Sequence, residues 1–298
     1  MSSSMMISSS AAATTTTSLS SICSGVELNT TKKSQEEAIA SLAQSIDRLS
    51  VEVKKLPQIA TINVGQQEEK VNTAFFANMS MKGLKRLAKH NSQALLEHGF
   101  CFSQGKGVPQ DLEKAATCFK LAADQGNSAA QLLIAFYYES GRGVHKNLAQ
   151  AAKYYKLAAD QQEMQAQYAI AVCYEKGIGI QENLKESAKY YRLAANQGHV
   201  LALWEMGRLL LLGWPGVAVN KVWAAKYFKL AASQGLVYAQ ISAAKCYEQG
   251  CGVPHNKAKA LKYYKMASEQ NSAEAKANLA RLQKEIDKSK TDQKMNKI

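Results

Sequence analysis

The side chains that could do catalytic chemistry are scattered along this sequence. Histidine is the commonest general base, yet the five histidines, His90, His98, His145, His199 and His255, lie in different parts of the chain. Ser187 has Tyr190 where the Ser-x-x-Lys motif of penicilloyl-serine enzymes needs a lysine. The Gly-x-Gly elements follow predicted helices and not strands, so they are not phosphate-binding loops. We therefore expect no catalytic residues and no enzyme activity.

The six cysteines form neither a zinc motif nor a disulfide framework. Cys101, Cys173 and Cys246 share one position of the repeat described below, but in alternate blocks. Helices stacked about 8 to 10 Å apart would hold them too far from one another to pair. We expect these three to be small buried side chains, and we expect no metal and no cofactor.

The composition is that of a folded chain with a basic surface. Of 298 residues, 46% are hydrophobic, only 4 are proline, and the formal net charge is +13. The longest uncharged apolar stretch, 209–219, is about half of the ~20 residues that a membrane-spanning helix needs. The sequence thus predicts no transmembrane segment and leaves acidic partners open, although the charge is too dispersed to indicate nucleic acid binding.

The first 25 residues contain ten serines and four threonines, and the first charged residue is Glu27. Such a segment buries too little apolar surface to fold, so residues 1–33 are expected to be a disordered tail. It lacks the features of a secretory signal and the arginines of a mitochondrial presequence. A plain tail on a cytoplasmic protein fits this composition, as do an organellar transit peptide and a bacterial export signal.

Residues 34–57 have the pattern of an amphipathic helix. Ser34 and Glu37 form a capping box, and Pro57 ends the run. Apolar residues recur between them at spacings of three and four: Ile39, Leu42, Ile46, Leu49, Val53 and Leu56. This seam is typical of a short parallel coiled coil, which would make the chain a homodimer, or of a helix that docks on its own chain.

The dominant feature is an internal repeat of 36 residues that begins near Asn91, with one extra residue in the fourth block. One alanine column contains Ala94, Ala130, Ala166, Ala202, Ala239 and Ala275. A second small-residue column, five positions later, contains Gly99, Ala135, Ala171, Gly207, Ala244 and Ala280. Because helices approach closely only where side chains are small, these columns predict a helix-to-helix contact in every block.

Each block is predicted to be a pair of helices. The first helix stops at a glycine column: Gly105, Gly141, Gly177, Gly213 and Gly250. The second starts at a capping column: Asp111, Asn147, Asn183, Asn220 and Asn256. It carries an aromatic pair such as Tyr154 and Tyr155, and the block closes on a glutamine. Such hairpins must stack to bury their apolar faces.

The pattern A-x-x-x-L-G-x-x-Y-x-x-G-x-G-V, an Asx residue, then K-A-x-x-Y-Y-K-x-A-A-x-Q-G resembles Sel1-like repeats, relatives of tetratricopeptide repeats. The resemblance spans about residues 91–286. It implies an all-α, right-handed α-solenoid and a non-enzymatic adaptor that binds other proteins. One secreted bacterial branch binds β-lactams or cell-wall fragments and has a disulfide in each repeat. This chain departs from that branch because its shared cysteine column lies in alternate blocks. Binding of a small ligand or cell-wall fragment by a secreted or translocated repeat protein is the alternative function.

By analogy with tetratricopeptide repeats, the first helices line a concave groove for a peptide or helix of a partner. The side chains expected there are Leu96, Phe100, Leu132, Phe136, Tyr168, Val172, Trp204, Arg208 and Lys245. Glu139, Glu175 and Glu248 border this apolar stripe. Aromatic and arginine anchors dominate binding energies, so the stripe has the composition of a binding groove. Some of its members could instead pack between neighbouring hairpins.

The second helices carry two columns of basic residues on one face. They contain Lys120, Lys156, Arg192, Lys229 and Lys265, and Lys153, Lys189, Lys226 and Lys262. This lysine ladder would lie on the convex side, either as a solvated surface or as a site for an acidic partner. Residues 58–90 are assigned to a linker and capping helix, and 287–298 to a lysine-rich disordered tail.

Overall fold

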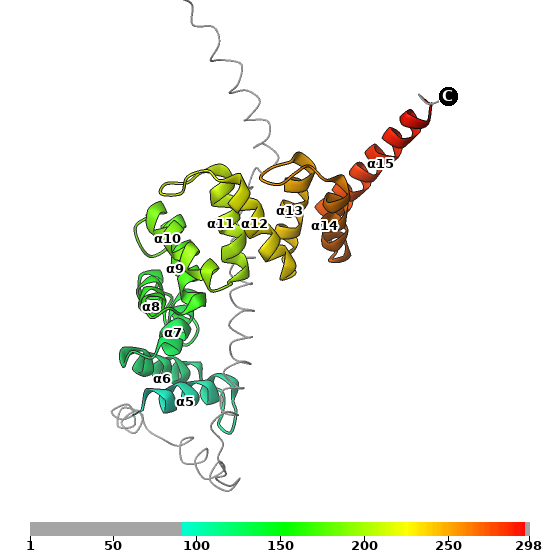
Figure 1. The fold of residues 1–298 in the computed structure, drawn as a ribbon. Coiled ribbons are helices and arrows are strands. Elements are labelled where there is room, and N and C mark those ends of the chain that lie inside the picture. Colours follow the sequence, from blue (N-terminus) through cyan, green and yellow to red (C-terminus); the bar gives the residue numbers. More distant parts are fainter. Residues whose placement is uncertain (1–90, 296–298) are drawn as a thin grey trace, which may run out of the picture. The chain divides into compact units, whose positions relative to one another are not determined.

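The structure is a computed structural model that describes residues 91–295. The chain divides into two units, 1–63 and 64–298, and the described residues belong to the second. The predicted tail (1–33), the heptad helix (34–57), the linker with its capping helix (58–90) and residues 296–298 therefore lie outside the described part. Within that part the named elements are all helices, and they form consecutive hairpins, as the repeat predicts (Figure 1).

Every hairpin pairs two helices of 13 residues, a first helix and a second helix. The first helices are α5 (Ser92–Gln104), α7 (Ser128–Ser140), α9 (Met164–Lys176), α11 (Val200–Leu212) and α13 (Val237–Gln249). The second helices are α6 (Leu112–Asp124), α8 (Leu148–Asp160), α10 (Leu184–Asn196), α12 (Lys221–Ser233) and α14 (Lys257–Glu269). The terminal α15 spans Ala273–Met295.

The helix ends form where the glycine and Asx columns predict them. Gly141 adopts φ 72°, and its N–H donates to the carbonyl of Tyr137. Six residues later the Asn147 side chain accepts a hydrogen bond from the backbone N–H of Gln150. The backbone N–H of Asn147 donates to the carbonyl of Tyr138. These bonds satisfy the free backbone groups at both ends of the turn and fix its geometry.

Neighbouring hairpins touch through backbone at the second glycine of the turn. A Cβ on Gly143 would lie 2.1 Å from the carbonyl oxygen of Leu112 in the preceding hairpin. Gly179 and Gly252 make the same approach to Leu148 and Lys221. Only glycine permits this contact, so these positions set the stacking of one hairpin on the next.

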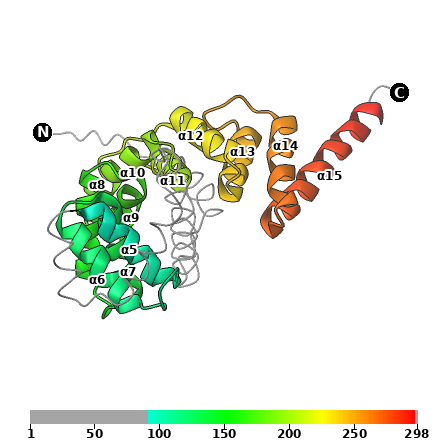
Figure 2. The same ribbon diagram turned by 90° about the horizontal axis from the view of Figure 1, so that it is seen from below.

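The hairpins stack with like helices side by side. In Figure 2, α5, α7 and α9 lie together on one side of α6 and α8. The core between the two rows is built from alanines of both helices and from the second aromatic residue of each pair, of which Tyr155, Tyr191 and Tyr264 are at most 1% exposed. We call the two outer surfaces the first-helix face and the second-helix face.

The last helix corrects one boundary. Residues 287–298 were expected to be disordered, but α15 continues through 287–295. Its sequence from Ala273 onward contains no glycine or proline and is rich in lysine, glutamine and alanine, which favour helix. Asp287 also accepts local hydrogen bonds from Gln283 and Thr291. Composition that resembles a solvated tail therefore extends the terminal helix by two turns.

Candidate functional site

The nine side chains predicted for the groove all lie on first helices, but to different depths. Five of them are at most 8% exposed: Leu96, Leu132, Phe136, Tyr168 and Arg208. The other four are half-buried: Phe100, Val172, Trp204 and Lys245. The burial of Leu132 and Phe136 agrees with the alternative that part of the apolar stripe packs between hairpins. The half-buried members are the ones that a partner could reach directly.

An aromatic pair lies on the first-helix face between α11 and α13. The ring centroids of Trp204 and Tyr238 are 5.8 Å apart, and Tyr238 is 52% exposed. The Trp204 indole N–H donates to Ser242 at 3.2 Å. Farther along α13, Lys245 pairs with Glu274 of α15 at 2.9 Å. The fixed indole and the exposed phenol ring next to a charged pair form an amphipathic surface.

Arg208 is a hub of buried charge. Its Nη2 lies 2.8 Å from Glu175 of α9, and its Nε lies 2.7 Å from Glu205 on its own helix. The guanidinium also lies 5.3 Å from the ring centre of Trp214. The second oxygen of Glu175 accepts from the Tyr191 hydroxyl at 2.5 Å. The network ties α9, α10 and α11 together, so Arg208 holds two hairpins in register.

These contacts shift the pKa values of the charged groups. Burial raises the pKa of Glu205, and the nearby charge of Glu175 adds to that rise, while Arg208 opposes it. Burial alone would lower the pKa of Arg208, but Glu205 and Glu175 raise it above its ordinary value. Arg208 therefore stays charged and committed to its two carboxylates, which makes it a structural residue of this face.

The glutamates that border the predicted groove accept hydrogen bonds from tyrosines of the second helices. Tyr155 donates to Glu139 at 2.6 Å, and Tyr264 donates to Glu248 at 2.8 Å, as Tyr191 does to Glu175. Each bond joins the two helices of one hairpin. Sequence analysis treated these glutamates only as the rim of a groove, but their second role is to pair with the buried phenols.

In the first and fourth hairpins a phenylalanine replaces the buried tyrosine. There the small-residue column holds Gly99 and Gly207 where the other hairpins have alanine. A Cβ on Gly99 would lie 2.3 Å from the Phe119 ring, and one on Gly207 would lie 2.5 Å from the Phe228 ring. The ring without a glutamate to bond thus packs directly on the opposite helix, where only glycine leaves room.

His199 caps α11 in its neutral form. Its Nδ1 accepts from the N–H of Ala202 at 3.2 Å, and its ring stacks on Tyr168 with centroids 4.5 Å apart. Burial lowers the pKa of His199 to about 4. The residue is therefore a helix cap, which the scattered positions of the histidines in the sequence did not reveal.

The closing glutamines join successive hairpins. Three buried glutamines on first helices donate to carbonyls at the end of the preceding second helix: Gln131 to Ala123, Gln167 to Ala159 and Gln240 to Ala232. Their own oxygens accept from glutamines at the end of the following second helix: Gln161, Gln197 and Gln270. This ladder satisfies backbone groups that stacking would otherwise leave buried and unbonded.

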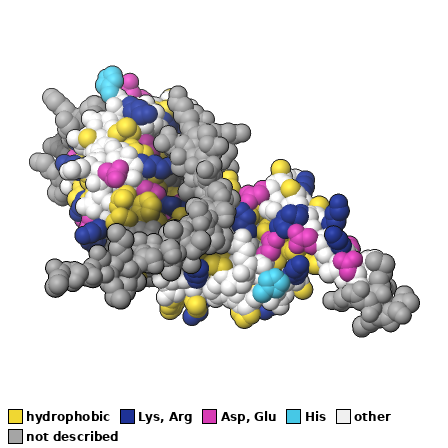
Figure 3. Space-filling view, turned by 90° about the horizontal axis from the view of Figure 1, so that it is seen from above, with side chains coloured by type: hydrophobic (Ala, Val, Ile, Leu, Met, Phe, Trp, Pro, Cys, Tyr) yellow, Lys and Arg dark blue, Asp and Glu magenta, His cyan; other side chains and the backbone are white. Residues whose placement is uncertain are grey.

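The lysine ladder of the second-helix face changes character along the chain. Lys120 and Lys156 pair with Asp124 and Asp160 one turn on, at 3.2 and 2.8 Å. At the matching position of α12, Lys229 has Ser233 one turn on. On the face seen in Figure 3, basic and acidic side chains are interspersed among hydrophobic ones.

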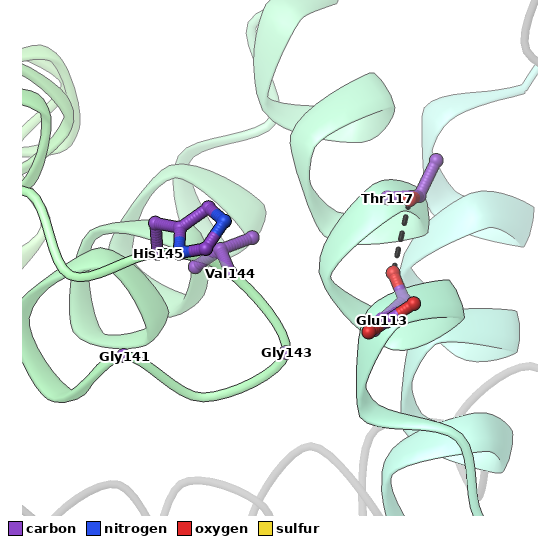
Figure 4. Close-up of a pocket in the computed structure, with 6 residues that line it drawn as sticks. All are labelled: Glu113, Thr117, Gly141, Gly143, Val144 and His145. Atoms are coloured by element: carbon purple, nitrogen blue, oxygen red, sulfur yellow. Dashed lines mark hydrogen bonds between the residues drawn. The ribbon is translucent and has the colours of Figure 1, made fainter.

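A cavity of about 530 Å³ lies between α6 and the turn after α7 (Figure 4). Its lining includes Glu113, Thr117, Val144 and His145. The Thr117 hydroxyl already donates to the Glu113 carbonyl at 2.9 Å. Ligand pockets are mostly apolar with a few convergent polar groups, and this lining of turn backbone and polar side chains does not have that composition.

Three further expectations can be compared with the described residues. Among residues 91–295, no three His, Cys, Asp or Glu side chains lie together as a metal site would require. The described cysteines are all free thiols, with Cys173 and Cys246 buried as predicted and Cys101 half-buried. None of the helices in this part is long and apolar enough to cross a bilayer.

The model of the Sel1 repeat matches residues 92–127, 128–163, 165–199, 200–236 and 237–272, the five hairpins described above. The chain belongs to the Sel1 repeat family. Sel1 repeat proteins commonly serve as scaffolds for protein interactions and are generally non-catalytic. A comparison with curated proteins found no match.

The solved structures that this chain resembles include two with the Sel1 repeat fold. One is a protective antigen of uropathogenic Escherichia coli, 32% identical with a TM-score of 0.62, over 69% of this chain and 44% of that one. The other is a Sel1 repeat protein from Oxalobacter formigenes, 31% identical with a TM-score of 0.58, over 67% of this chain and 78% of that one. This Sel1 chain thus spans less than half the length of the E. coli protein.

Proposed function

We propose that this Sel1 repeat protein is a non-enzymatic adaptor that binds a segment of a partner protein on its first-helix face. The observation that carries the proposal is the pair Trp204 and Tyr238. These rings lie on adjacent first helices, and the phenol is half exposed while the indole is held by Ser242. Rigid aromatic side chains of this kind supply most of the energy at protein interfaces.

Charged groups follow this pair toward the C-terminal ends of α11 and α13. Arg208 lies one turn after Trp204 and pairs with Glu205 of α11 and Glu175 of α9, and Lys245, which pairs with Glu274, lies two turns after Tyr238 on α13. A partner segment would place an apolar side chain against the rings and polar groups toward the charges. An apolar centre with a polar rim is the usual anatomy of such an interface.

Affinity capture with mass spectrometry tests the proposal. The bait is the full chain, compared with a Trp204→Ala, Tyr238→Ala double variant and with a Leu157→Ala control on the second-helix face, where Leu157 is 41% exposed. Circular dichroism confirms that each bait is folded. Buried Phe136 is avoided, because a charge there would unfold the hairpin.

We expect the wild type and the Leu157 control to capture the same partners and the double variant to lose them. Loss of two aromatic anchors typically weakens binding by about 100-fold or more, which removes a micromolar partner from a capture experiment. If all three baits capture the same proteins, the first-helix face is not the binding surface.

A further inference from the structure

The fourth hairpin is unlike the others on its second-helix face. Val222 and Trp223 occupy the first turn of α12, where the other second helices have Glu113 and Lys114, Ala149 and Gln150, Lys185 and Glu186, or Ala258 and Lys259. Val219, just before the cap, stands where the others have Gln110, Lys146, Glu182 and His255. The fourth block thus has apolar residues at two positions that are polar in every other block, those of Val219 and Trp223, and a larger apolar residue at the position of Val222.

These side chains are exposed. Val219, Val222 and Trp223 are 51 to 55% exposed, and Leu230, two turns farther along α12, is 50% exposed. At 100° per residue, Val222, Trp223, Tyr227 and Leu230 fall within one side of the helix. We call Val219, Val222, Trp223, Tyr227 and Leu230 the α12 strip.

The fold does not need Val219, Val222 and Trp223 of the α12 strip, because the other hairpins form with polar residues or alanine at these positions. The opposite side of α12 supplies the core through Ala224, Ala225, Phe228, Ala231 and Ala232, which are at most 3% exposed. The position of Trp223 holds lysine in α6 (Lys114) and in α14 (Lys259), and both helices form the same kind of hairpin. Exposed apolar residues that packing does not require are typical of an interaction surface.

The lysines of α12 have no acidic partner on their own helix. α12 carries Lys221, Lys226 and Lys229 and no acidic residue. Lys226 lies over the Trp223 ring at 4.3 Å. Lys229 has no acidic residue one turn on, whereas its counterparts Lys120 of α6 and Lys156 of α8 pair with Asp124 and Asp160. The following second helix, α14, has four lysines and one glutamate, and one of these lysines, Lys257, pairs with Glu285 of α15 at 3.6 Å. The positive charge around the strip is therefore uncompensated by its own helix.

We propose that the α12 strip is a docking site for an acidic amphipathic helix of a partner protein. From Val222 to Leu230 the strip is about 12 Å long at 1.5 Å per residue, which matches two turns of a helix laid along it. Apolar side chains of the partner would pack on Trp223 and Leu230. Its carboxylates would pair with Lys226 and Lys229, which have no carboxylate partner within residues 91–295. This site lies on the face opposite the one in the proposed function and is independent of it.

The chain itself supplies the variants for the test. A triple variant, Val219→Lys, Val222→Ala and Trp223→Lys, restores residues that other hairpins have at these positions, so folding is expected to be preserved. The triple variant also adds positive charge. Charge attraction alone would therefore strengthen binding of an acidic peptide, whereas loss of the apolar contacts would weaken it. A second variant, Lys226→Glu with Lys229→Glu, reverses the charge. Gln150→Lys in α8 is the matched control for Trp223→Lys.

The probe is a phage-displayed library of helical peptides about four turns long, selected on the full wild-type chain. Selected peptides are then titrated by fluorescence anisotropy against every variant at low and high salt. The same proteins are tested for binding to vesicles of phosphatidylcholine and phosphatidylserine, and for self-association by sedimentation.

The proposal predicts enriched peptides with glutamate or aspartate beside apolar residues spaced by three and four. Their affinity falls by about tenfold or more in both the triple variant and the charge reversal, weakens with salt, and is unchanged in the Gln150 control. It is overturned if no peptide is enriched, or if the triple variant binds the peptides equally or better. Vesicle binding or self-association that the triple variant abolishes would overturn it in favour of a membrane or a second copy.

Discussion

Replacing His199 by asparagine should remove a pH-dependent part of the stability. Asn91 and Asn127 hold the corresponding position in α5 and α7, and their side chains cap those helices as His199 caps α11. His199→Asn therefore keeps the cap and removes the titrating ring. The variant isolates the contribution of one proton.

The sign of the effect follows from the pKa. Burial lowers the pKa of His199 from 6.5 to about 4, so the unfolded chain binds the proton more readily than the folded chain does. The stability associated with neutral His199 is present above pH 6.5 and is lost as the pH falls toward 4. Protonation would also remove the Nδ1 lone pair that accepts from Ala202.

At pH 5 these two pKa values correspond to about 2 kcal/mol of lost stability relative to pH 8, taken as an upper estimate for a half-buried ring. Urea denaturation of both proteins at the two pH values measures it. Groups such as Glu205 titrate alike in the two proteins, so they cancel in the difference. Parallel pH profiles for wild type and variant would refute the buried neutral cap.

Three further changes test the packing of the hairpins. Gly207→Ala forces a Cβ against the Phe228 ring and should lower the free energy of unfolding by about 1 to 3 kcal/mol. Urea titration measures this loss, and an unchanged midpoint would show that the contact is loose. Arg208→Met leaves two carboxylates without their partner and should lower the free energy of unfolding by about 3 to 5 kcal/mol. A small shift in the thermal midpoint would contradict this. Gln167→Leu removes the hydrogen bond to the Ala159 carbonyl and should lower the free energy of unfolding by about 1 to 3 kcal/mol. Amide exchange at the end of α8 should also become faster, and unaltered exchange would contradict the prediction.

The repeat predicts the backbone of the described part well, because its columns consist of residue types with strong local backbone preferences. Glycine at the end of each first helix and Asx at the start of each second helix determine turn geometry independently of packing. Four of the five turns have the same spacing and the fourth turn has one extra residue, so the register of the hairpins follows from the sequence. The boundary at residue 287 was wrong because a charged stretch without a core can still continue an existing helix.

The exposure of each side chain is harder to predict, because it depends on how closely neighbouring hairpins approach. Phe136 and Trp204 occupy equivalent faces of α7 and α11, yet Phe136 is buried and Trp204 is half-buried. One structural pairing did leave a signal in the sequence. Tyrosine follows Glu139, Glu175 and Glu248 by 16 residues, whereas phenylalanine stands in the two blocks that have Ser103 and Leu211 at the glutamate position.

Photo-crosslinking in cells tests the central claim most directly. A benzoylphenylalanine is placed at Tyr238, which is 52% exposed on the first-helix face, and in a second protein at Leu157 on the second-helix face. An adaptor that works through its first helices predicts a discrete crosslinked partner from position 238 that the Trp204→Ala change abolishes. Crosslinks that form only from position 157, or that survive the loss of Trp204, would contradict it.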